Sequence, residues 1–377
     1  MCSLFHFYCS VIALFQTVVD CQCFETNKDL MFDISGDIKG NFVKEGADTH
    51  CICLPYWECK DVNQATYKED FGLSEVRSNE NNQNILSAKC SGYLDVCCKV
   101  KCGIQYSMAG HTTNMHKRIL GDADIAEFGE FPWMLGILDG TVYKCGGSLI
   151  HPKVALTAAH CVTAPVKYTV RAGEWHWKHM DEPLLHQDRT VAFINIHPQF
   201  DSSSLRNDIA LLVLKSPFKL TSHVGIICVP PPDLNVDTTR CTAAGWGRNS
   251  KHGVYQPILK KVDLPIVPFR ECERILQKTL GPLFELDDTF ICAGGEPGKD
   301  TCKGDGGSPL MCPITGETNR YQQVGVVSWG IICGLTQAPG AYVNVMLYSD
   351  WIDGEMIKMS LKPNIYRHNY DIKTQSK

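Results

Sequence analysis

Three short strings in a fixed order constrain this 377-residue chain more than any other feature. They are LTAAHC, which contains His160, NDIALL, which contains Asp208, and CKGDGGSPL, which contains Gly306. An imidazole that takes a proton and a carboxylate that fixes its tautomer are two parts of a machinery for acyl transfer. The third part, a nucleophilic hydroxyl, is missing from the third string, because glycine has no side chain.

In their order and flanking residues these strings resemble the chymotrypsin-like serine proteases, over about residues 119–359. The resemblance implies an all-β fold of two barrels, with Gly306 in place of the nucleophilic serine. The residue pattern also favours an all-β fold, because from Ile119 onward short β-branched runs alternate with Gly and Pro. Such a pattern is typical of a barrel or a sandwich. We expect one helix, around Tyr348–Met359.

Ser308 is the nearest substitute for the lost nucleophile. Two residues of extended chain displace a side chain by about 6–7 Å, whereas attack requires a hydroxyl within about 3.2 Å of the base. The string otherwise keeps the register of the family, so Ser308 stands where the family has a glycine. We therefore interpret His160 and Asp208 as a hydrogen-bonded relic of a triad, and we predict no proteolytic activity.

Residues of a substrate pocket persist in the same region. By the resemblance, Asp300 corresponds to the acid at the base of the pocket in trypsin-like members, where a carboxylate favours Arg or Lys ligands. Ile332 stands where those members usually have glycine, so a working pocket and a blocked one are equally compatible with the sequence. The positions of the pocket walls and of the oxyanion hole correspond to Ser328, Gly330, Gly340 and Gly304.

The string HKRILGD at 116–122 resembles the activation site of the family. Cleavage after Arg118 would free the ammonium group of Ile119, which by the resemblance pairs with Asp305. Removing one partner of a buried ion pair is costly, which is how such a pair can act as a switch.

Twenty cysteines indicate a disulfide-rich, secreted protein rather than a cytosolic one. The apolar run CSVIALFQTVV at 9–19 is too short to span a bilayer, and we interpret it as the core of a signal peptide. The expected location is therefore extracellular. The expected organisation is a signal peptide at 1–21, an N-terminal segment at 22–50, a cysteine-rich module at 51–98, a linker with the activation site at 99–118, the protease-like domain at 119–359 and a tail at 360–377.

The module at 51–98 contains six cysteines and is too small to be stable without covalent links. The same thiols could hold zinc, although secretion favours disulfides. The spacing, which ends in Cys-Cys ahead of a protease-like domain, resembles the arthropod clip domain. For the module this implies the pairs Cys51–Cys97, Cys53–Cys90 and Cys59–Cys98, while the sequence alone leaves its connectivity open. For the rest of the chain the protease resemblance implies Cys102–Cys228, Cys145–Cys161, Cys241–Cys312, Cys272–Cys292 and Cys302–Cys333; Cys21 and Cys23 are left unassigned.

The loop GEWHWKHMDEP holds Glu174, Asp181 and Glu182, and in some relatives of the family this loop binds Ca²⁺ through oxygen ligands. A solvated charged loop is the alternative that we favour, and we interpret His176 and His179 as surface residues. We expect no other cofactor. A net charge of −5 does not indicate the basic surface that nucleic-acid binding requires. No segment after the signal peptide is long and apolar enough to suggest a membrane anchor.

The clip-like module together with the glycine in GDGGSPL resembles the arthropod clip-domain serine protease homologues, over about residues 51–359. The resemblance implies a secreted, non-catalytic cofactor in an innate-immune proteolytic cascade of a haemolymph-like fluid, above all in prophenoloxidase activation during melanisation. The implied partners are prophenoloxidase or phenoloxidase, an upstream clip-domain protease, and further copies of the chain after cleavage. Two alternatives stay open, namely a recognition protein that binds microbial surfaces and an active trypsin-like protease of the same fold.

Overall fold

The structure is a computed structural model of the chain. It describes residues 51–55, 95–99, 101–105, 124–178, 182–237, 239–247, 255–296, 305–330 and 338–368, with the backbone alone for the first two ranges. Within these residues no helix is long and apolar enough to cross a membrane.

Two short strands, far apart in the sequence, form an antiparallel pair in the cysteine-rich module. Strand β1 (Cys51–Pro55) pairs with β2 (Asp95–Lys99) in antiparallel fashion, and the register places Cys53 opposite Cys97. The three disulfides expected in this module lie outside the described side chains.

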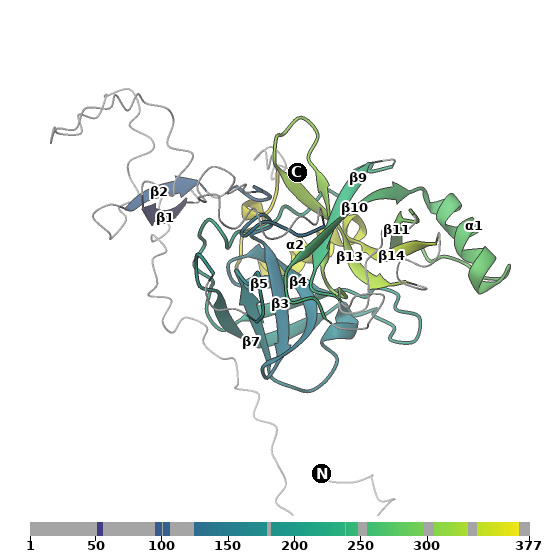
Figure 1. Cartoon of the computed structure of the whole chain (residues 1–377). Helices are drawn as coiled ribbons and strands as arrows, with labels where there is room; N and C mark the ends of the chain where they lie inside the picture. Colours follow the sequence, from purple (N-terminus) through teal and green to yellow (C-terminus); the bar gives the residue numbers. More distant parts are fainter. Residues whose placement is uncertain are drawn as a thin grey trace, which may run out of the picture. The chain divides into compact units, whose positions relative to one another are not determined.

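Two closed six-stranded barrels make up the rest of the described chain, which confirms the all-β, two-barrel prediction (Figure 1). The first barrel has the strand order β3-β4-β5-β8-β7-β6 and the second has the order β10-β11-β14-β13-β12-β9. Closure pairs every strand of these two barrels on both sides, so neither barrel has an unpaired edge strand among the described residues. The strands of the first barrel are β3 (Met134–Asp139), β4 (Val142–His151), β5 (Val154–Thr157), β6 (Tyr168–Ala172), β7 (Gln187–Ile196) and β8 (Ala210–Leu214). Those of the second are β9 (Arg240–Gly245), β10 (Lys260–Val267), β11 (Phe290–Gly294), β12 (Pro309–Pro313), β13 (Tyr321–Trp329) and β14 (Pro339–Asn344).

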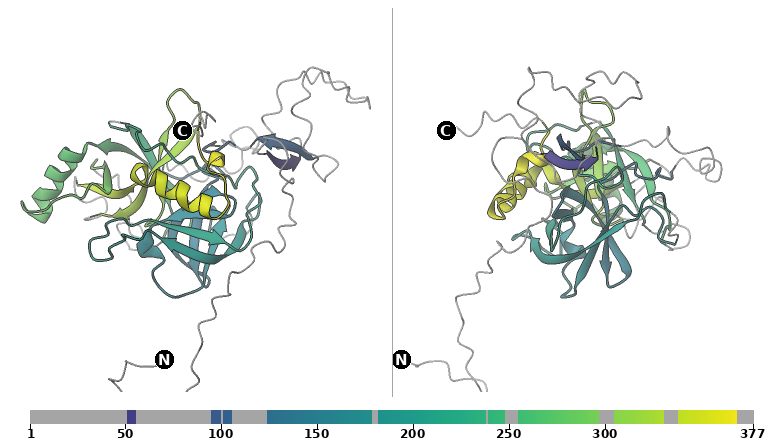
Figure 2. Two further views of the ribbon diagram at one scale, coloured as in Figure 1. Left: turned by 180° about the vertical axis from the view of Figure 1, so that it is seen from behind. Right: turned by 90° about the vertical axis from the view of Figure 1, so that its left-hand side faces the viewer.

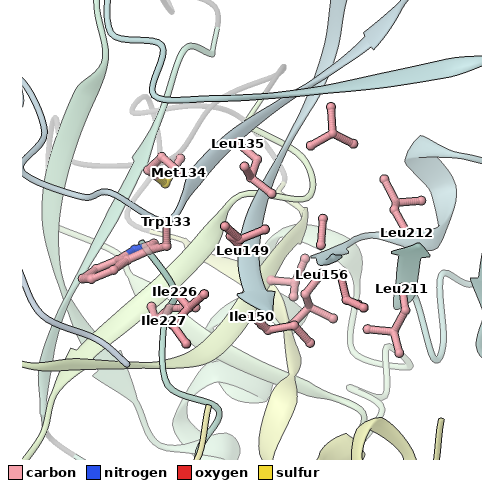
Figure 3. Packing of buried hydrophobic residues seen from close by; sticks show 14 of the residues in the cluster. Trp133, Met134, Leu135, Leu149, Ile150, Leu156, Leu211, Leu212, Ile226 and Ile227 are labelled. Atoms are coloured by element: carbon pink, nitrogen blue, oxygen red, sulfur yellow. The ribbon is translucent and has the colours of Figure 1, made fainter. Parts of the chain in front are cut away.

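The interior of the first barrel is filled by side chains from strands far apart in the sequence. Every residue of β5 and of β8 is buried, and the two strands are neighbours in the barrel. Leu149 and Leu156, from neighbouring strands, belong to the same buried cluster as Leu211 and Ile227, and Figure 3 shows these side chains. This burial of branched apolar side chains is the main source of stability of the barrel.

Two helices lie outside the barrels. Helix α2 (Ser349–Lys358) confirms the predicted C-terminal helix; it is drawn in yellow in Figure 2, and its Glu355 accepts a hydrogen bond from Asn195 of β7. Helix α1 (Phe269–Leu280) was not expected. It buries Cys272 and Leu276, and Phe269 and Ile275 are half-buried against the same cluster, so an apolar pattern at helical spacing was present in the sequence and was overlooked.

The described chain contains four disulfides, all of them pairs that the resemblance implied. They are Cys102–Cys228, Cys145–Cys161, Cys241–Cys312 and Cys272–Cys292. The pair Cys302–Cys333 lies outside the described residues.

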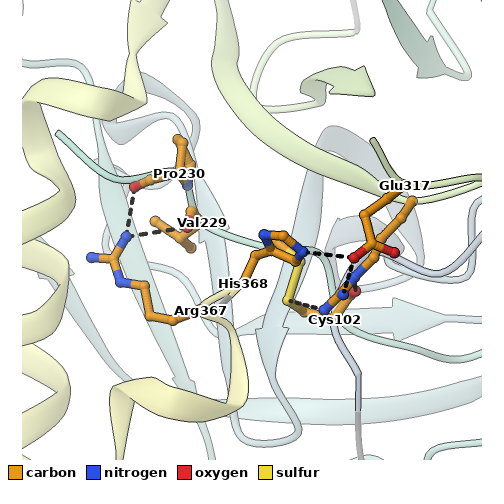
Figure 4. Close-up of a disulfide and its surroundings, with 8 residues drawn as sticks. Cys102, Val229, Pro230, Glu317, Arg367 and His368 are labelled. Atoms are coloured by element: carbon orange, nitrogen blue, oxygen red, sulfur yellow. Dashed lines mark hydrogen bonds and ion pairs between the residues drawn. A yellow bond between two sulfur atoms is a disulfide. The ribbon is translucent and has the colours of Figure 1, made fainter. Parts of the chain in front are cut away.

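Residues after α2 return to the body of the domain beside the Cys102–Cys228 disulfide (Figure 4). Tyr366 is fully buried, Arg367 donates to the carbonyl oxygens of Val229 and Pro230, and the His368 ring lies 3.0 Å from a carboxylate oxygen of Glu317. These contacts hold the C-terminal segment close to the point where the linker enters the second barrel.

Candidate functional site

The first barrel places an imidazole and a carboxylate in contact. His160 lies in the short 3-10 helix after β5, and Asp208 lies just before β8. The His160 Nδ1 is 2.6 Å from Asp208 Oδ2, and the His160 backbone N–H donates to Asp208 Oδ1 at 2.8 Å. Because a carboxylate only accepts, Nδ1 carries the proton and Nε2 is left as the basic nitrogen.

Ser328 completes this arrangement from the second barrel. Its hydroxyl donates to Asp208 Oδ2 at 2.6 Å, so the fully buried carboxylate accepts three hydrogen bonds. A buried charge needs such partners to be tolerated. The sequence analysis placed Ser328 only in the pocket wall; no local pattern reveals that it reaches the carboxylate, since the two residues are 120 positions apart.

Gly306 occupies the place from which a nucleophile would face His160. A Cβ atom built at Gly306 would lie 2.9 Å from His160 Nε2, closer than unbonded carbon and nitrogen normally approach. The imidazole therefore occupies part of the space that a side chain at this position would need. A base and its orienting carboxylate are present, and the position opposite the base offers no hydroxyl.

Ser308 is buried against a different part of the molecule. It is fully buried, and its hydroxyl lies so close to Gly146 that a Cβ on that glycine would overlap it. It also packs beside Gly245. The neighbours of a Cβ at Gly306 are His160 and Cys161. The positive φ of 82° belongs to Gly307 and not to Ser308, so close packing rather than backbone strain is what distinguishes the serine.

Asp305 lies beside the turn that follows β9. Its Oδ1 accepts a hydrogen bond from the Gly247 N–H at 2.7 Å, and a Cβ on Gly245 or Gly247 would overlap the carboxylate. Burial raises the pKa of the nearby Tyr143 well above its usual value, and the charge of Asp305 raises it further. The expected partner Ile119 and the bond after Arg118 lie outside the described residues.

The pocket is described only in part. Trp329, next to Ser328, packs edge-on against Phe284 and Phe290, and Gly340 lies in β14. Gly330 is exposed at the end of β13. Asp300, Gly304 and Ile332 lie outside the described residues. The role of Asp300 at the base of the pocket therefore stays a prediction, as does the effect of Ile332 on access to it.

The acidic loop after β6 brings two carboxylates together. Glu174 is 6% exposed, its Oε2 accepts from Arg171 at 3.1 Å, and its Oε1 is buried without a hydrogen-bond partner. Burial raises the pKa of Glu182 to about 7, and the charge of Glu174 adds to this although two backbone N–H groups oppose it. Either a proton shared between the two carboxylates or a bound cation would satisfy this oxygen. Asp181 lies outside the described residues.

The expectation that His176 is a surface residue was wrong. Only 8% of it is exposed, and its backbone forms an antiparallel bridge with Ile258 of the second barrel, which the sequence gives no means of seeing. His179 lies outside the described residues. Among the described residues, the only compact group of three or more side chains of metal-ligand type is Cys145, His160 and Cys161, and the two cysteines are joined in a disulfide.

Comparison with known proteins gives matches to both parts of the chain. A trypsin profile matches residues 122–352, and a profile described as the serine protease clip domain PPAF-2 matches residues 40–99. Phenoloxidase-activating factor 2 of Galleria mellonella is 48% identical over 269 residues, which are 67% of this chain and 89% of the relative. Inactive CLIP domain-containing serine protease A8 of Anopheles gambiae is 33% identical over 333 residues, 80% of this chain and 87% of the relative. Inactive CLIP domain-containing serine protease A3 of Aedes aegypti is 37% identical over 324 residues, which are 80% of this chain and 66% of the relative.

Proposed function

The chain belongs to the trypsin family and carries a clip domain ahead of its trypsin-like domain, and from this premise we propose that it is a secreted, non-catalytic cofactor in the activation of prophenoloxidase. Gly306 opposite His160 Nε2 is the observation that carries the proposal. Without a nucleophile no acyl-enzyme can form. In subtilisin, loss of the nucleophile costs on the order of 10⁶ in rate.

The names of the relatives support the choice of pathway. One is named as a phenoloxidase-activating factor and two are named as inactive clip-domain proteases. The intact barrels support a role as a binding scaffold, because the loss is confined to one turn while the base and its carboxylate keep their hydrogen bonds. The partners we propose are prophenoloxidase and an upstream clip-domain protease, which would cut after Arg118.

The linker is built to stay attached after such a cut. Cys102 is bonded to Cys228, the Gly103 N–H donates to the Ile226 carbonyl at 2.7 Å, and the Tyr321 N–H donates to the Gly103 carbonyl at 2.8 Å. The clip domain would therefore remain joined to the trypsin-like domain in the processed protein.

Reconstitution from purified components tests this function. Prophenoloxidase and its activating protease are mixed with the cut protein, with the uncut protein, or with neither, and phenoloxidase activity is measured. We expect full activity only with the cut protein. Equal activity without it would overturn the proposal, and binding of the cut protein to bacterial or fungal wall material instead would favour the microbial recognition alternative.

Ca²⁺ is the one cofactor that we propose. Glu174 and Glu182 would hold it, together with oxygen atoms of the same loop, since carboxylate and carbonyl oxygens are what Ca²⁺ prefers. When bound, the ion would neutralise the two neighbouring carboxylates and hold the loop in one conformation.

A further inference from the structure

Residues 101–105 of the linker lie on the trypsin-like domain as an extended peptide held by backbone hydrogen bonds. The Gly103 N–H donates to the Ile226 carbonyl at 2.7 Å, and the Tyr321 N–H donates to the Gly103 carbonyl at 2.8 Å. The Gln105 N–H donates to the Asn319 carbonyl at 2.9 Å. Main-chain hydrogen bonds of this kind are a common way in which domains bind an extended peptide.

Gly103 fits this place because it has no side chain. Its φ is +74°, a conformation that glycine adopts at no steric cost. A Cβ built on it would overlap the Tyr321 carbonyl oxygen and lie 3.0 Å from the Cys228 Sγ. The neighbouring Cys102 is only 2% exposed. The surface thus selects a glycine by shape, as a specific peptide-binding site does.

Arg320 closes the site from the turn between β12 and β13. Its side chain is 11% exposed, and its Nε–H donates to the Cys102 carbonyl at 3.0 Å. Glu317 accepts from the same guanidinium at 3.5 Å and lies 3.0 Å from the His368 ring (Figure 4). The turn and the C-terminal segment together therefore position the guanidinium against the linker.

Gln105 fastens the other end of the docked segment. Its side-chain amide donates to Glu130 Oε1 at 3.1 Å, and this carboxylate also accepts from the Lys261 ammonium group at 2.7 and 2.9 Å. Glu130 is only 8% exposed. Gln105 precedes Arg118 in the sequence and Glu130 follows it, so this bond joins the two pieces that a cut after Arg118 would produce.

We propose that these contacts bind the linker independently of the Cys102–Cys228 disulfide, so that the trypsin-like domain is a binding site for its own linker and retains the clip domain after the cut. Only Val100 and Lys101 lie between β2 and Cys102, so whatever holds Cys102 also holds the clip domain. The inference goes beyond the proposed function, because it involves no partner protein and uses the cut only as a means of severing the chain.

A variant that lacks the disulfide tests the inference directly. The Cys102→Ser, Cys228→Ser double variant is cut by limited trypsin treatment, the cut after Arg118 is verified by mass, and the product is run on gel filtration without detergent. At about 10 μM protein, where complexes of micromolar affinity persist, we expect both pieces in one peak. Separate elution of the two pieces would overturn the inference.

Three further substitutions in this double variant test the site. Gly103→Ala and Arg320→Gln should each weaken the association at least about tenfold, the first by overlap with Tyr321 and the second by loss of a charged donor. Arg240→Gln is the matched control, because Arg240 lies in the same barrel and pairs with Glu296. A dilution series measures the dissociation constants. No weakening in Gly103→Ala, or equal weakening in Arg320→Gln and Arg240→Gln, contradicts the site.

Hydrogen exchange on the parent protein, whose disulfide is intact, keeps the inference testable if the double variant fails to fold. We expect the amides of Gly103, Gln105 and Tyr321 to exchange at least about tenfold more slowly than in an unstructured peptide. Gly103→Ala should remove the protection at Gln105 and Tyr321 while the disulfide stays formed. Unprotected amides in the parent protein would mean that the disulfide alone holds the linker, and would overturn the inference.

The outcome is separable from that of the proposed function. Retention of the linker by a protein that has no effect on prophenoloxidase would remove the proposed function and leave the binding site for the linker standing.

Discussion

The two barrels differ in how much of the catalytic arrangement each one retains. The first keeps His160 and Asp208 in hydrogen-bonding geometry, with the carboxylate fully buried. The second keeps Ser328 on the same carboxylate but carries Gly306 and Ser308 in the turn where the nucleophile and a glycine belong.

The difference shows which parts of an active site a fold needs for its own stability. A buried carboxylate must keep its hydrogen-bond donors, since leaving polar groups unpaired costs about 1–3 kcal/mol each. An exposed hydroxyl has no such structural task. Loss of catalysis can therefore occur in the second barrel without any change in the first.

The largest expected effect comes from restoring the turn of the second barrel. Gly306→Ser alone should give little turnover of an Arg-amide substrate, because a Cβ at position 306 would lie 2.9 Å from His160 Nε2 and Ser308 still fills the place of a glycine beside Gly146. Adding Ser308→Gly should raise turnover, after cleavage at Arg118, on the order of 10³-fold above the parent, a fraction of the roughly 10⁶ that a nucleophile contributes. Adding Ile332→Gly should raise it further.

His160→Ala in the same backgrounds is the control and should remove the restored activity. If the single variant matches the triple variant, the second barrel was never remodelled beyond Gly306. If all of them are inactive, Asp300 no longer serves a working pocket.

A smaller effect is expected from removing the buried carboxylate of the first barrel. Asp208→Ala leaves the His160 N–H groups and the Ser328 hydroxyl without their acceptor, so the free energy of unfolding should fall by about 3 kcal/mol. Gly306→Ala, in the second barrel, should cost less than about 1 kcal/mol, because the side chain of His160 is 30% exposed and can swing outward. Urea unfolding measures both, and equal losses would contradict the comparison.

Attachment of the linker to the trypsin-like domain is tested by limited proteolysis, which measures connectivity and not stability. Limited trypsin treatment should give two pieces on a reducing gel and one species on a non-reducing gel, because Cys102–Cys228 bridges the cut. The Cys102→Ser, Cys228→Ser double variant is the control. Two separate pieces from the parent protein without reductant would refute the bridge.

The smallest effect concerns pH and the first barrel. Burial lowers the pKa of His151 to about 4 from an ordinary 6.5, and its Nδ1 accepts the Lys153 N–H. The unfolded chain takes up a proton below pH 6.5 that the folded protein resists until about pH 4, so stability should fall as pH drops through this window. In His151→Asn, which keeps an acceptor, thermal unfolding should show a shallower loss between pH 7 and pH 5. Identical slopes would exclude His151 as the cause.

Much of the fold followed from local sequence. The short β-branched runs predicted a barrel or a sandwich, the resemblance to the chymotrypsin-like proteases predicted two barrels, and the string around Tyr348 predicted α2. Helix α1 was missed although Phe269, Cys272, Ile275 and Leu276 recur at helical spacing and pack on one cluster, and the disulfide to Cys292 fixes the helix as well.

The sequence by itself determined that the nucleophile is gone, since no tertiary arrangement can give Gly306 a hydroxyl. It also determined which residues could form the base and its carboxylate. Only the tertiary structure decided that Ser328 supports Asp208, that Ser308 is packed against Gly146, and that Trp175 joins the acidic loop to Ala126 and Trp246. These contacts join residues that are distant in the chain and carry no local pattern. They exist because closing two barrels brings strand ends together in space, and the packing and hydrogen bonds available there select the partners.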